Sequence, residues 1–310
     1  MPENSWFFIV NPNAGKGLGK KKWPEICSLL EKFKFNYDFE FTQRRGHALE
    51  IAQRIPGEKY KNLVGVGGDG TMNEIVNGVM TNISGISDTI AVGMIPVGTG
   101  NDFARNNNIP LNYEKAIQVL NSSKNQLHDV GKANFYSEGK QLTRYFYIIA
   151  GMGFDGEVNR KSNIDKRNGK SSKILYVKNL LLTLKSYKPV SFNITDDNSS
   201  FEKVVFTLAV GKGKRNGGGM MQLPFAKPDD GYLDYTVVEK VPRRTVVALL
   251  PKLFKGTHIE HPKVSTFKTK NLDINTSDSV LLEIDGEDAG KAPFSFEIIP
   301  KALKIITNLD

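Results

Sequence analysis

The stretch Gly67-Gly68-Asp69-Gly70-Thr71 decides the fold, because it stands where a buried apolar run ends and a helix should begin. Three glycines around one aspartate are poor material for a hydrophobic core. They suit a phosphate-binding loop, since backbone N–H groups without a neighbouring Cβ can approach an anion closely. The aspartate in such a loop can hold the Mg²⁺ that phosphates bring with them. The stretch therefore predicts a nucleoside-triphosphate site.

Apolar strands alternate with helical patterns on both sides of this loop. The predicted strands are residues 6–10, 37–41, 62–66 and 90–95, and the predicted helices are residues 23–33, 48–55 and 71–79. Such alternation with short connections predicts a parallel sheet that is covered on both faces. Ligands of such sheets bind beyond the carboxyl ends of the strands. The glycine-rich segments 11–17, 67–71 and 96–102 all fall there.

Two of these segments, 96–102 and 11–17, do not indicate a phosphate site when each is taken alone. Pro96-Val97-Gly98-Thr99-Gly100-Asn101-Asp102 contains a threonine that can donate to phosphate and a carboxylate, but alone it could be a turn and a helix N-cap. Asn11-Pro12-Asn13-Ala14-Gly15-Lys16-Gly17 could likewise be an ordinary turn. Residues 65–70 also match G-x-G-x-x-G, but the acidic residue of a dinucleotide site is missing after the next strand. Three loops at the ends of parallel strands favour one phosphate-binding site.

After Asp129 the pattern changes to many strands separated by Gly, Asn, Asp or Pro turns. The predicted strands are residues 142–149, 190–195, 203–210, 233–238, 264–274, 280–284 and 294–299, and the predicted helices are residues 174–187 and 243–254. Many strands with few crossovers predict an antiparallel sandwich or barrel-like domain. A last strand at 303–307 could return to the first domain. We therefore expect an α/β domain at 1–130, with 300–310 returning, and an all-β domain at 131–299.

Composition is that of an ordinary globular protein, with 39% hydrophobic and 24% charged residues. A length of 310 residues favours two domains. No apolar run approaches the ~20 residues that cross a bilayer, and the first ten residues do not resemble a signal peptide. The single cysteine, Cys27, fits a reducing cytoplasm.

The net charge of +9 favours anionic partners such as nucleotides, acidic membranes or nucleic acid. Part of the excess lies between residues 159 and 173, where six basic residues accompany Asp165 alone. This segment could be a solvated flexible loop or an electrostatic membrane contact. The apolar helix expected at 174–187 could pack in the core or lie at a lipid interface. No recognised nucleic-acid motif accompanies the charge, so we expect no nucleic-acid partner.

Together these segments resemble the diacylglycerol kinase catalytic-domain family, in particular its bacterial lipid-kinase branch, which has sphingosine kinase relatives. The matching segments are 11–15, 67–74, 96–105, 151–155, 216–220, 229–234 and 285–287. The glycine-aspartate signature is shared with NAD kinases and phosphofructokinases. The resemblance implies an N-terminal parallel-sheet α/β nucleotide-binding domain of that type and a C-terminal antiparallel β-sandwich domain that binds the lipid substrate.

The resemblance also implies residue roles. Glu287 would be the general base, because a carboxylate near a lipid hydroxyl can accept its proton as the oxygen attacks the γ-phosphate. Asp69 would position the nucleotide and the catalytic Mg²⁺, with Asp102 and Asp129 joining through water. The implied nucleotide contacts are Asn11, Pro12, Asn13, Ala14, Gly15, Thr42, Gly67, Gly68, Asp69, Gly70, Thr71, Asn73, Glu74, Thr99 and Asp102.

A structural Mg²⁺ is implied at Asp230, with the backbone carbonyls of Lys227 and Tyr232 as further ligands. Without the resemblance, residues 229–231 could be only a loop, and Asp285-Gly286-Glu287 could be a surface hairpin turn.

The expected function is ATP- and Mg²⁺-dependent transfer of the γ-phosphate to the hydroxyl of a diacylglycerol-like lipid, in phospholipid biosynthesis. The protein would be cytoplasmic, would touch the inner membrane face transiently and could be a homodimer. Its lipid tail would need an apolar cleft between the sheets of the β-rich domain or beneath the 174–187 helix. A soluble-substrate kinase such as an NAD kinase, a sphingoid-base kinase and a non-catalytic binding protein are the alternatives. Diacylglycerol, monoacylglycerol, sphingoid bases and phosphatidylglycerol all offer a hydroxyl, and pocket shape decides among them.

Overall fold

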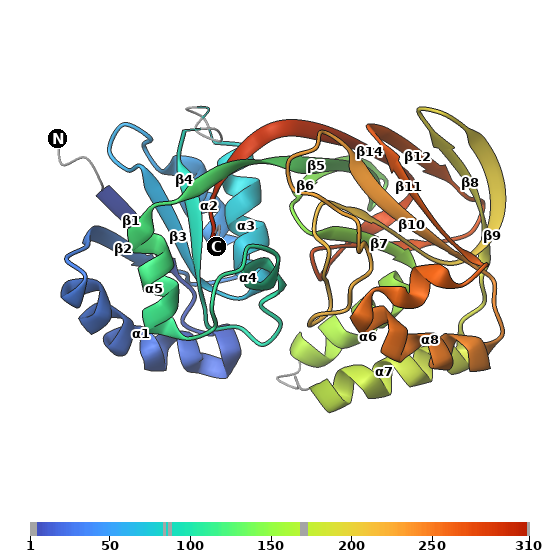
Figure 1. The fold of residues 1–310 in the computed structure, drawn as a ribbon, viewed down its shortest axis with the longest axis horizontal. Coiled ribbons are helices and arrows are strands. Elements are labelled where there is room, and N and C mark those ends of the chain that lie inside the picture. The colour runs from blue at the N-terminus through green and yellow to red at the C-terminus, as the bar shows by residue number, and fades with distance from the viewer. Residues whose placement is uncertain (1–4, 83–84, 86–88, 168–172, 309–310) are drawn as a thin grey trace. The chain divides into compact units, whose positions relative to one another are not determined.

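A computed structural model describes residues 5–82, 85, 89–167 and 173–308 of the chain (Figure 1). These residues form two compact units. The first comprises residues up to 130 with 217–219 and 299 onward, and the second comprises residues 131–216 and 220–298. Strands β5 (Asn125–Ser137) and β14 (Glu287–Ile306) each continue along the chain from one unit into the other. Residues 217–219 thus lie in the first unit, whereas the sequence predicts them in the second domain.

A parallel sheet forms the centre of the first unit. Its strands are β1 (Ser5–Val10), β2 (Asn36–Phe41), β3 (Asn62–Gly67) and β4 (Ala91–Pro96), in the order β2-β1-β3-β4. The end of β14 adds a fifth parallel strand, in which Lys304 pairs with Ala91. Every residue of β3 and β4 is buried, which explains their continuous apolar character.

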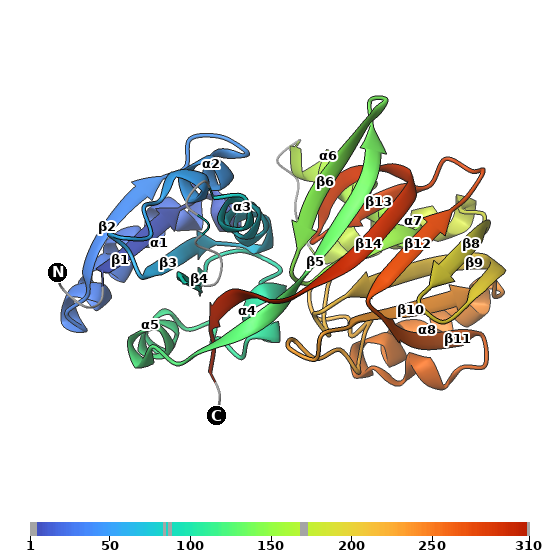
Figure 2. The same cartoon turned by 90° about the horizontal axis from the view of Figure 1, so that it is seen from above.

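Helices cover both faces of this sheet. They are α1 (Ala14–Lys32), α2 (His47–Arg54), α3 (Asp69–Met80), α4 (Asp102–Asn106) and α5 (Tyr113–Ser122). Trp23 and Leu30 of α1 and Leu120 of α5 share a core cluster with Phe8 and Val66 of the sheet. Helices α2 and α3 pack together on the side opposite α5, as Figure 2 shows. The strand ends between these layers carry the glycine-rich loops.

The second unit is an antiparallel barrel. Besides parts of β5 and β14, its strands are β6 (Lys140–Phe146), β7 (Ile149–Gly153), β8 (Val190–Asp196), β9 (Ser200–Gly211), β10 (Leu233–Glu239), β11 (Val264–Thr269), β12 (Asn271–Asn275) and β13 (Leu281–Ile284). The antiparallel pairings β9-β7-β13-β14-β12-β8-β9 close a ring. The strands of this ring pair on both sides, and the unit encloses a core that includes Phe146, Phe192 and Tyr235.

Three helices accompany the barrel, namely α6 (Phe154–Arg167), α7 (Lys173–Ser186) and α8 (Arg243–Lys255), with a short 3₁₀ helix, η1 (Thr257–Glu260). The loop interpretation of 159–173 is therefore wrong for 159–167, while 168–172 lie outside the described residues. Helix α6 is polar along most of its length, and its apolar residues Phe154 and Val158, one turn apart, pack in the core. Leu180 and Leu184 anchor α7 in the same cluster.

The strand expected at 264–274 is two strands, β11 and β12, separated at Lys270. The carboxylate of Asp197 accepts hydrogen bonds from the backbone N–H groups of Lys270 and Asn271, at 2.6 and 3.2 Å, and so holds the break. None of the helices in the described ranges combines the length and apolar character that crossing a membrane requires.

Candidate active site

Three glycine-rich loops meet in the first unit, at the carboxyl ends of β1, β3 and β4. The backbone N–H of Gly98 donates to the carbonyl of Gly67 at 3.1 Å, and the amide of Asn11 donates to Thr71 Oγ1 at 2.9 Å. A Cβ added to Gly98 would lie 2.5 Å from the Cα of Gly68. The loops therefore touch through backbone, and side chains at these positions would separate them.

The first loop needs left-handed backbone. Gly15, Lys16 and Gly17 have φ values of 59°, 62° and 88°, and a Cβ on Gly15 would lie 2.1 Å from the carbonyl oxygen of Val97. The neighbouring Asn13 N–H donates to Asn11 Oδ1 at 3.0 Å, which closes the turn that contains Pro12 and begins at the end of β1.

Asp69 is the first residue of α3, and its carboxylate faces the third loop. Its Oδ1 accepts from the backbone N–H of Phe103 at 2.9 Å. A Cβ on Gly100 would lie 2.5 Å from its Oδ2, so a larger residue there would displace this carboxylate. Thr99 is exposed at the tip of the same loop, whereas Thr42 is buried after β2 and donates its N–H to Val10 at 2.9 Å.

Asp102 has a partner that sequence reasoning missed. Its side chain is buried, and its Oδ2 accepts from the backbone N–H of Gly218 at 2.6 Å. Gly217, Gly218 and Gly219 have φ values of 60°, 85° and 110°, a run that only glycine adopts readily. Arg105 lies 3.2 Å from the other oxygen. The glycine triplet belongs to the matching segment 216–220, but nothing in the sequence ties it to Asp102.

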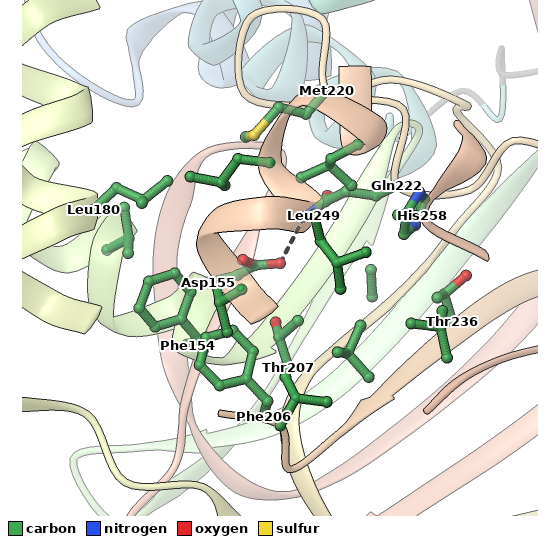
Figure 3. Close-up of a pocket in the computed structure, with 18 of the residues that line it drawn as sticks. Phe154, Asp155, Leu180, Phe206, Thr207, Met220, Gln222, Thr236, Leu249 and His258 are labelled. Atoms are coloured by element: carbon green, nitrogen blue, oxygen red, sulfur yellow. Dashed lines mark hydrogen bonds between the residues drawn. The ribbon is translucent and has the colours of Figure 1, made fainter. Parts of the chain in front are cut away.

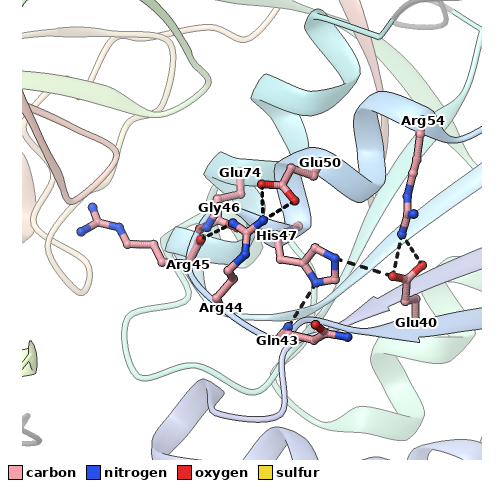
Figure 4. Close-up of polar contacts among 10 residues, drawn as sticks. Glu40, Gln43, Arg44, Arg45, Gly46, His47, Glu50, Arg54 and Glu74 are labelled. Atoms are coloured by element: carbon pink, nitrogen blue, oxygen red, sulfur yellow. Dashed lines mark hydrogen bonds and ion pairs between the residues drawn. The ribbon is translucent and has the colours of Figure 1, made fainter.

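Glu74 caps a helix, which differs from its expected nucleotide contact. Its two carboxylate oxygens accept from the backbone N–H groups of Gly46 and Ala48, at 2.8 and 3.1 Å, at the beginning of α2 (Figure 4). A carboxylate there satisfies unpaired N–H groups and complements the helix dipole. Asn73, also expected to contact nucleotide, is buried within α3. In this structure Glu74 therefore stabilises the start of α2, and Asn73 lies inside the fold.

Asp129 has no solvent exposure, and its Oδ1 accepts from the backbone N–H of Lys301 at 2.9 Å. It holds the returning segment of β14, and its expected role at the catalytic Mg²⁺ stays a prediction. In the described part of the chain, no group of three or more His, Cys, Asp or Glu side chains could hold a metal ion. Mg²⁺ at a kinase site often takes one or two carboxylates and completes its shell with phosphates and water. Asp69 beside the loops fits that donor set.

Asp285 and Gly286 form the two-residue turn between β13 and β14. Their φ values of 48° and 84° are those of a type I′ hairpin, and Ile284 pairs with Glu287 across it. Glu287 is partly exposed. The hairpin interpretation is thus correct in geometry, and it places Glu287 as the first residue of β14.

Buried polar groups hold this turn. The carboxylate of Asp285 accepts from the backbone N–H groups of Tyr147, Ile148 and Ile149, at 3.1, 3.0 and 3.0 Å. The Gly286 N–H donates to Glu283 Oε2 at 2.7 Å. Burial raises the pKa of Glu283 well above its ordinary value. Sequence reasoning missed the contacts of Asp285, because its partners lie far away along the chain, and it also missed Glu283, three residues before Gly286.

The expected structural Mg²⁺ site does not fit the side chains around it. Asp230 and the carbonyl of Tyr232 do converge, but the Nζ of Lys212 donates to both, at 2.7 and 2.5 Å. Lys268 pairs with the second oxygen of Asp230. Lys227, the third expected ligand, is exposed. An ammonium group thus occupies the position expected for the metal, so the side chains observed around Asp230 do not fit a divalent ion there.

The second unit contains an apolar pocket with about 770 Å³ of space including its mouth, between the sheet and helices α6, α7 and α8 (Figure 3). Its apolar lining includes Phe154, Leu180 and Leu249. Its polar lining includes Asp155, whose Oδ2 accepts from the Gln222 amide at 2.6 Å. Burial raises the pKa of Asp155 to about 6.

Both halves of the chain match known families. Residues 5–133 match the diacylglycerol kinase catalytic domain. Residues 148–307 match the YegS C-terminal NAD kinase beta sandwich-like domain.

Similar proteins span nearly the whole chain. A Staphylococcus carnosus protein named diacylglycerol kinase is 30% identical over 302 residues, which cover 97% of this chain and 94% of that protein. A Bacillus subtilis protein provisionally named lipid kinase YtlR is 31% identical, with 97% and 99% covered. A Bacillus anthracis crystal structure, provisionally described as a diacylglycerol kinase, has a TM-score of 0.80 at 27% identity and covers 99% of this chain and 96% of that one. The chain therefore belongs to the diacylglycerol kinase family of phosphotransferases.

Proposed function

We propose that this protein is an ATP- and Mg²⁺-dependent lipid kinase that phosphorylates the hydroxyl of a diacylglycerol-like lipid. The observation that carries the proposal is the convergence of three loops at backbone distance in the first unit. The Gly98 N–H donates to Gly67 at 3.1 Å, and a Cβ on Gly98 would lie 2.5 Å from Gly68. Such a cradle of small residues suits phosphates.

In this proposal the first unit, residues 1–130 with 300–310, binds ATP. Residues 11–15, 67–71 and 96–102 line the phosphates, and Thr42 and Thr99 add contacts. The side-chain Oδ1 of Asn101 is buried without a hydrogen-bond partner among the described residues, as expected of a loop that awaits a ligand. Asp69, with Asp102 beside it, would hold Mg²⁺ through water. When bound, that ion neutralises charge on the phosphates.

The second unit, residues 131–299 in the expected division, supplies the base and binds the lipid. The lipid hydroxyl oxygen attacks the γ-phosphorus while its proton passes to the carboxylate of Glu287, and the bond from phosphorus to the ADP oxygen breaks. The turn at Asp285 supports this role, because three backbone hydrogen bonds fix the start of β14.

We further propose that the pocket between α6, α7 and α8 takes an acyl chain, since its lining is mainly apolar. Val177, Leu181 and Leu182 of α7 are exposed at about half their surface, 53%, 48% and 50%. Exposed apolar side chains next to lysines suit transient contact with a membrane surface. This supports a cytoplasmic protein that collects its substrate from the inner membrane face.

The experiment is radiolabelled ATP with diacylglycerol, monoacylglycerol, sphingosine or phosphatidylglycerol in mixed micelles, and with NAD as a soluble acceptor. Products are separated by chromatography. We expect labelled phosphatidic acid from diacylglycerol. Label on sphingosine alone would keep the mechanism and change the lipid. Label on NAD alone would contradict the proposal and establish the soluble-substrate alternative.

A further inference from the structure

The turn at residues 229–232 brings two oxygens toward one point in the second unit. Gly231 has a φ of 75°, which reverses the chain between Asp230 and Tyr232. The carboxylate of Asp230 and the carbonyl of Tyr232 both face the end of β9. Two hard oxygens from a tight Asp-Gly turn are typical ligands of a divalent cation.

That point is taken by the side chain of Lys212. This residue directly follows β9, and its N–H donates to the carbonyl of Ile148 at 3.0 Å, which fixes its backbone. The side chain is 1% exposed. Its Nζ donates to Asp230 Oδ1 at 2.7 Å and to the carbonyl of Tyr232 at 2.5 Å. A charge buried to this extent persists only when it is paired and hydrogen-bonded.

A second lysine completes the arrangement. Lys268 of β11 lies opposite Asp234 of β10, and its Nζ pairs with Asp230 Oδ2 and lies 3.7 Å from Asp234 Oδ2. Both oxygens of Asp230 therefore face ammonium groups. Mg²⁺ needs about six oxygens at ~2.1 Å, and its double charge would be repelled by two neighbouring ammonium groups.

We propose that the Lys212 ammonium is a built-in substitute for a structural divalent cation, so that the 229–232 turn is held without a metal. The inference concerns only the second unit and its stability. It does not depend on the proposed kinase activity or on the Mg²⁺ that accompanies ATP. The protein should then need divalent ions for nucleotide chemistry alone.

The test is thermal unfolding of the nucleotide-free protein with EDTA, Mg²⁺ or Mn²⁺. For the wild type we expect the same Tm in all three. Lys212→Met keeps the aliphatic stem and removes the charge, so it should lower the Tm in EDTA, and Mg²⁺ or Mn²⁺ should recover part of the loss. Lys203→Met removes an exposed lysine of β9, the strand that Lys212 follows. Lys203 pairs with Glu239 at 3.2 Å, and this variant should show no dependence on metal.

A second measurement covers the case in which Lys212→Met does not fold. This measurement is equilibrium binding of Mn²⁺ to nucleotide-free Asp69→Asn protein, in which the proposed catalytic site is weakened. Adding Asp230→Asn to this protein should leave the amount of bound Mn²⁺ unchanged. Mn²⁺ bound to this protein and lost with Asp230→Asn would overturn the inference. A folded Lys212→Met protein that metals do not stabilise would overturn it as well, because Lys212 would then be an ordinary buried ion pair.

Discussion

Replacing Asp285 with Asn tests how the proposed base is positioned. The carboxylate accepts three backbone hydrogen bonds, two at Oδ1 from Ile148 and Ile149 and one at Oδ2 from Tyr147. Asparagine tolerates the φ of 48° at this position. It keeps one acceptor oxygen but presents an NH₂ group to the third N–H. The variant therefore removes the charge and one hydrogen bond while leaving the turn sterically possible.

The expected loss follows from these contacts. A hydrogen bond to a charged group contributes about 1.5–3 kcal/mol net, and an unsatisfied buried donor costs a similar amount. We expect the free energy of unfolding of the second unit to fall by about 3 kcal/mol. For a unit of its size this corresponds to about 6–12 °C in Tm. A shifted Glu287 should also lower kcat by about tenfold to a hundredfold.

The assay combines thermal unfolding with lipid-kinase kinetics. The Tm and kcat of Asp285→Asn should fall while the KM for ATP stays unchanged, because the nucleotide loops lie in the other unit. Asp273→Asn is the matched control, since Asp273 is exposed on β12 of the same unit, and it should alter neither property. A wild-type Tm and kcat in Asp285→Asn would refute the reasoning that these bonds hold the turn.

Three further predictions concern the loops, the helix cap and the pocket. Gly98→Ala should weaken ATP binding about tenfold or more, because its Cβ would lie 2.5 Å from Gly68 Cα. Calorimetry measures the affinity, and an unchanged affinity would show that the loops need not touch. Glu74→Gln should lower the free energy of unfolding by about 1–2 kcal/mol in urea titrations and leave the KM for ATP unchanged, since Glu74 caps α2. A raised KM with normal stability would contradict this and favour the expected nucleotide contact. Burial raises the pKa of Asp155 from 3.8 to about 6, so the native state binds the extra proton between these values. The stability of the wild type relative to Asp155→Asn should therefore be highest below about pH 4 and fall by roughly 2–3 kcal/mol as pH rises through 6; a difference that does not change with pH would contradict this.

The local pattern of apolar residues predicts most of the helices and strands. It fails where few residues of a helix are buried. The apolar runs at β1, β3 and β4 mark their strands because both faces of these strands are covered. Helix α6 escapes prediction, since its sequence is mostly polar and few apolar residues, such as Phe154 and Val158, mark its buried face. Closure of the barrel depends on which distant strands pair, and periodicity carries no information on that choice.

Residue types at the site are predictable, but their partners are not. Glycines at 67, 68 and 98 already indicate a close backbone approach by their residue type, and the loops do touch there. The carboxylates of Glu74 and Asp129 look equally suited to a ligand, yet backbone N–H groups far along the chain take them. Lys212 gives no signal at all, because a lysine after a strand is usually solvated.

The most direct test of the proposed chemistry is phosphoryl transfer by Glu287→Gln, with ATP binding measured on the same protein. Glutamine keeps the size of the side chain and cannot accept the proton. Transfer to diacylglycerol should fall by a factor on the order of 10²–10⁴, while the Kd for ATP and the Tm stay at wild-type values. Transfer at the wild-type rate would contradict the account and remove Glu287 from the mechanism.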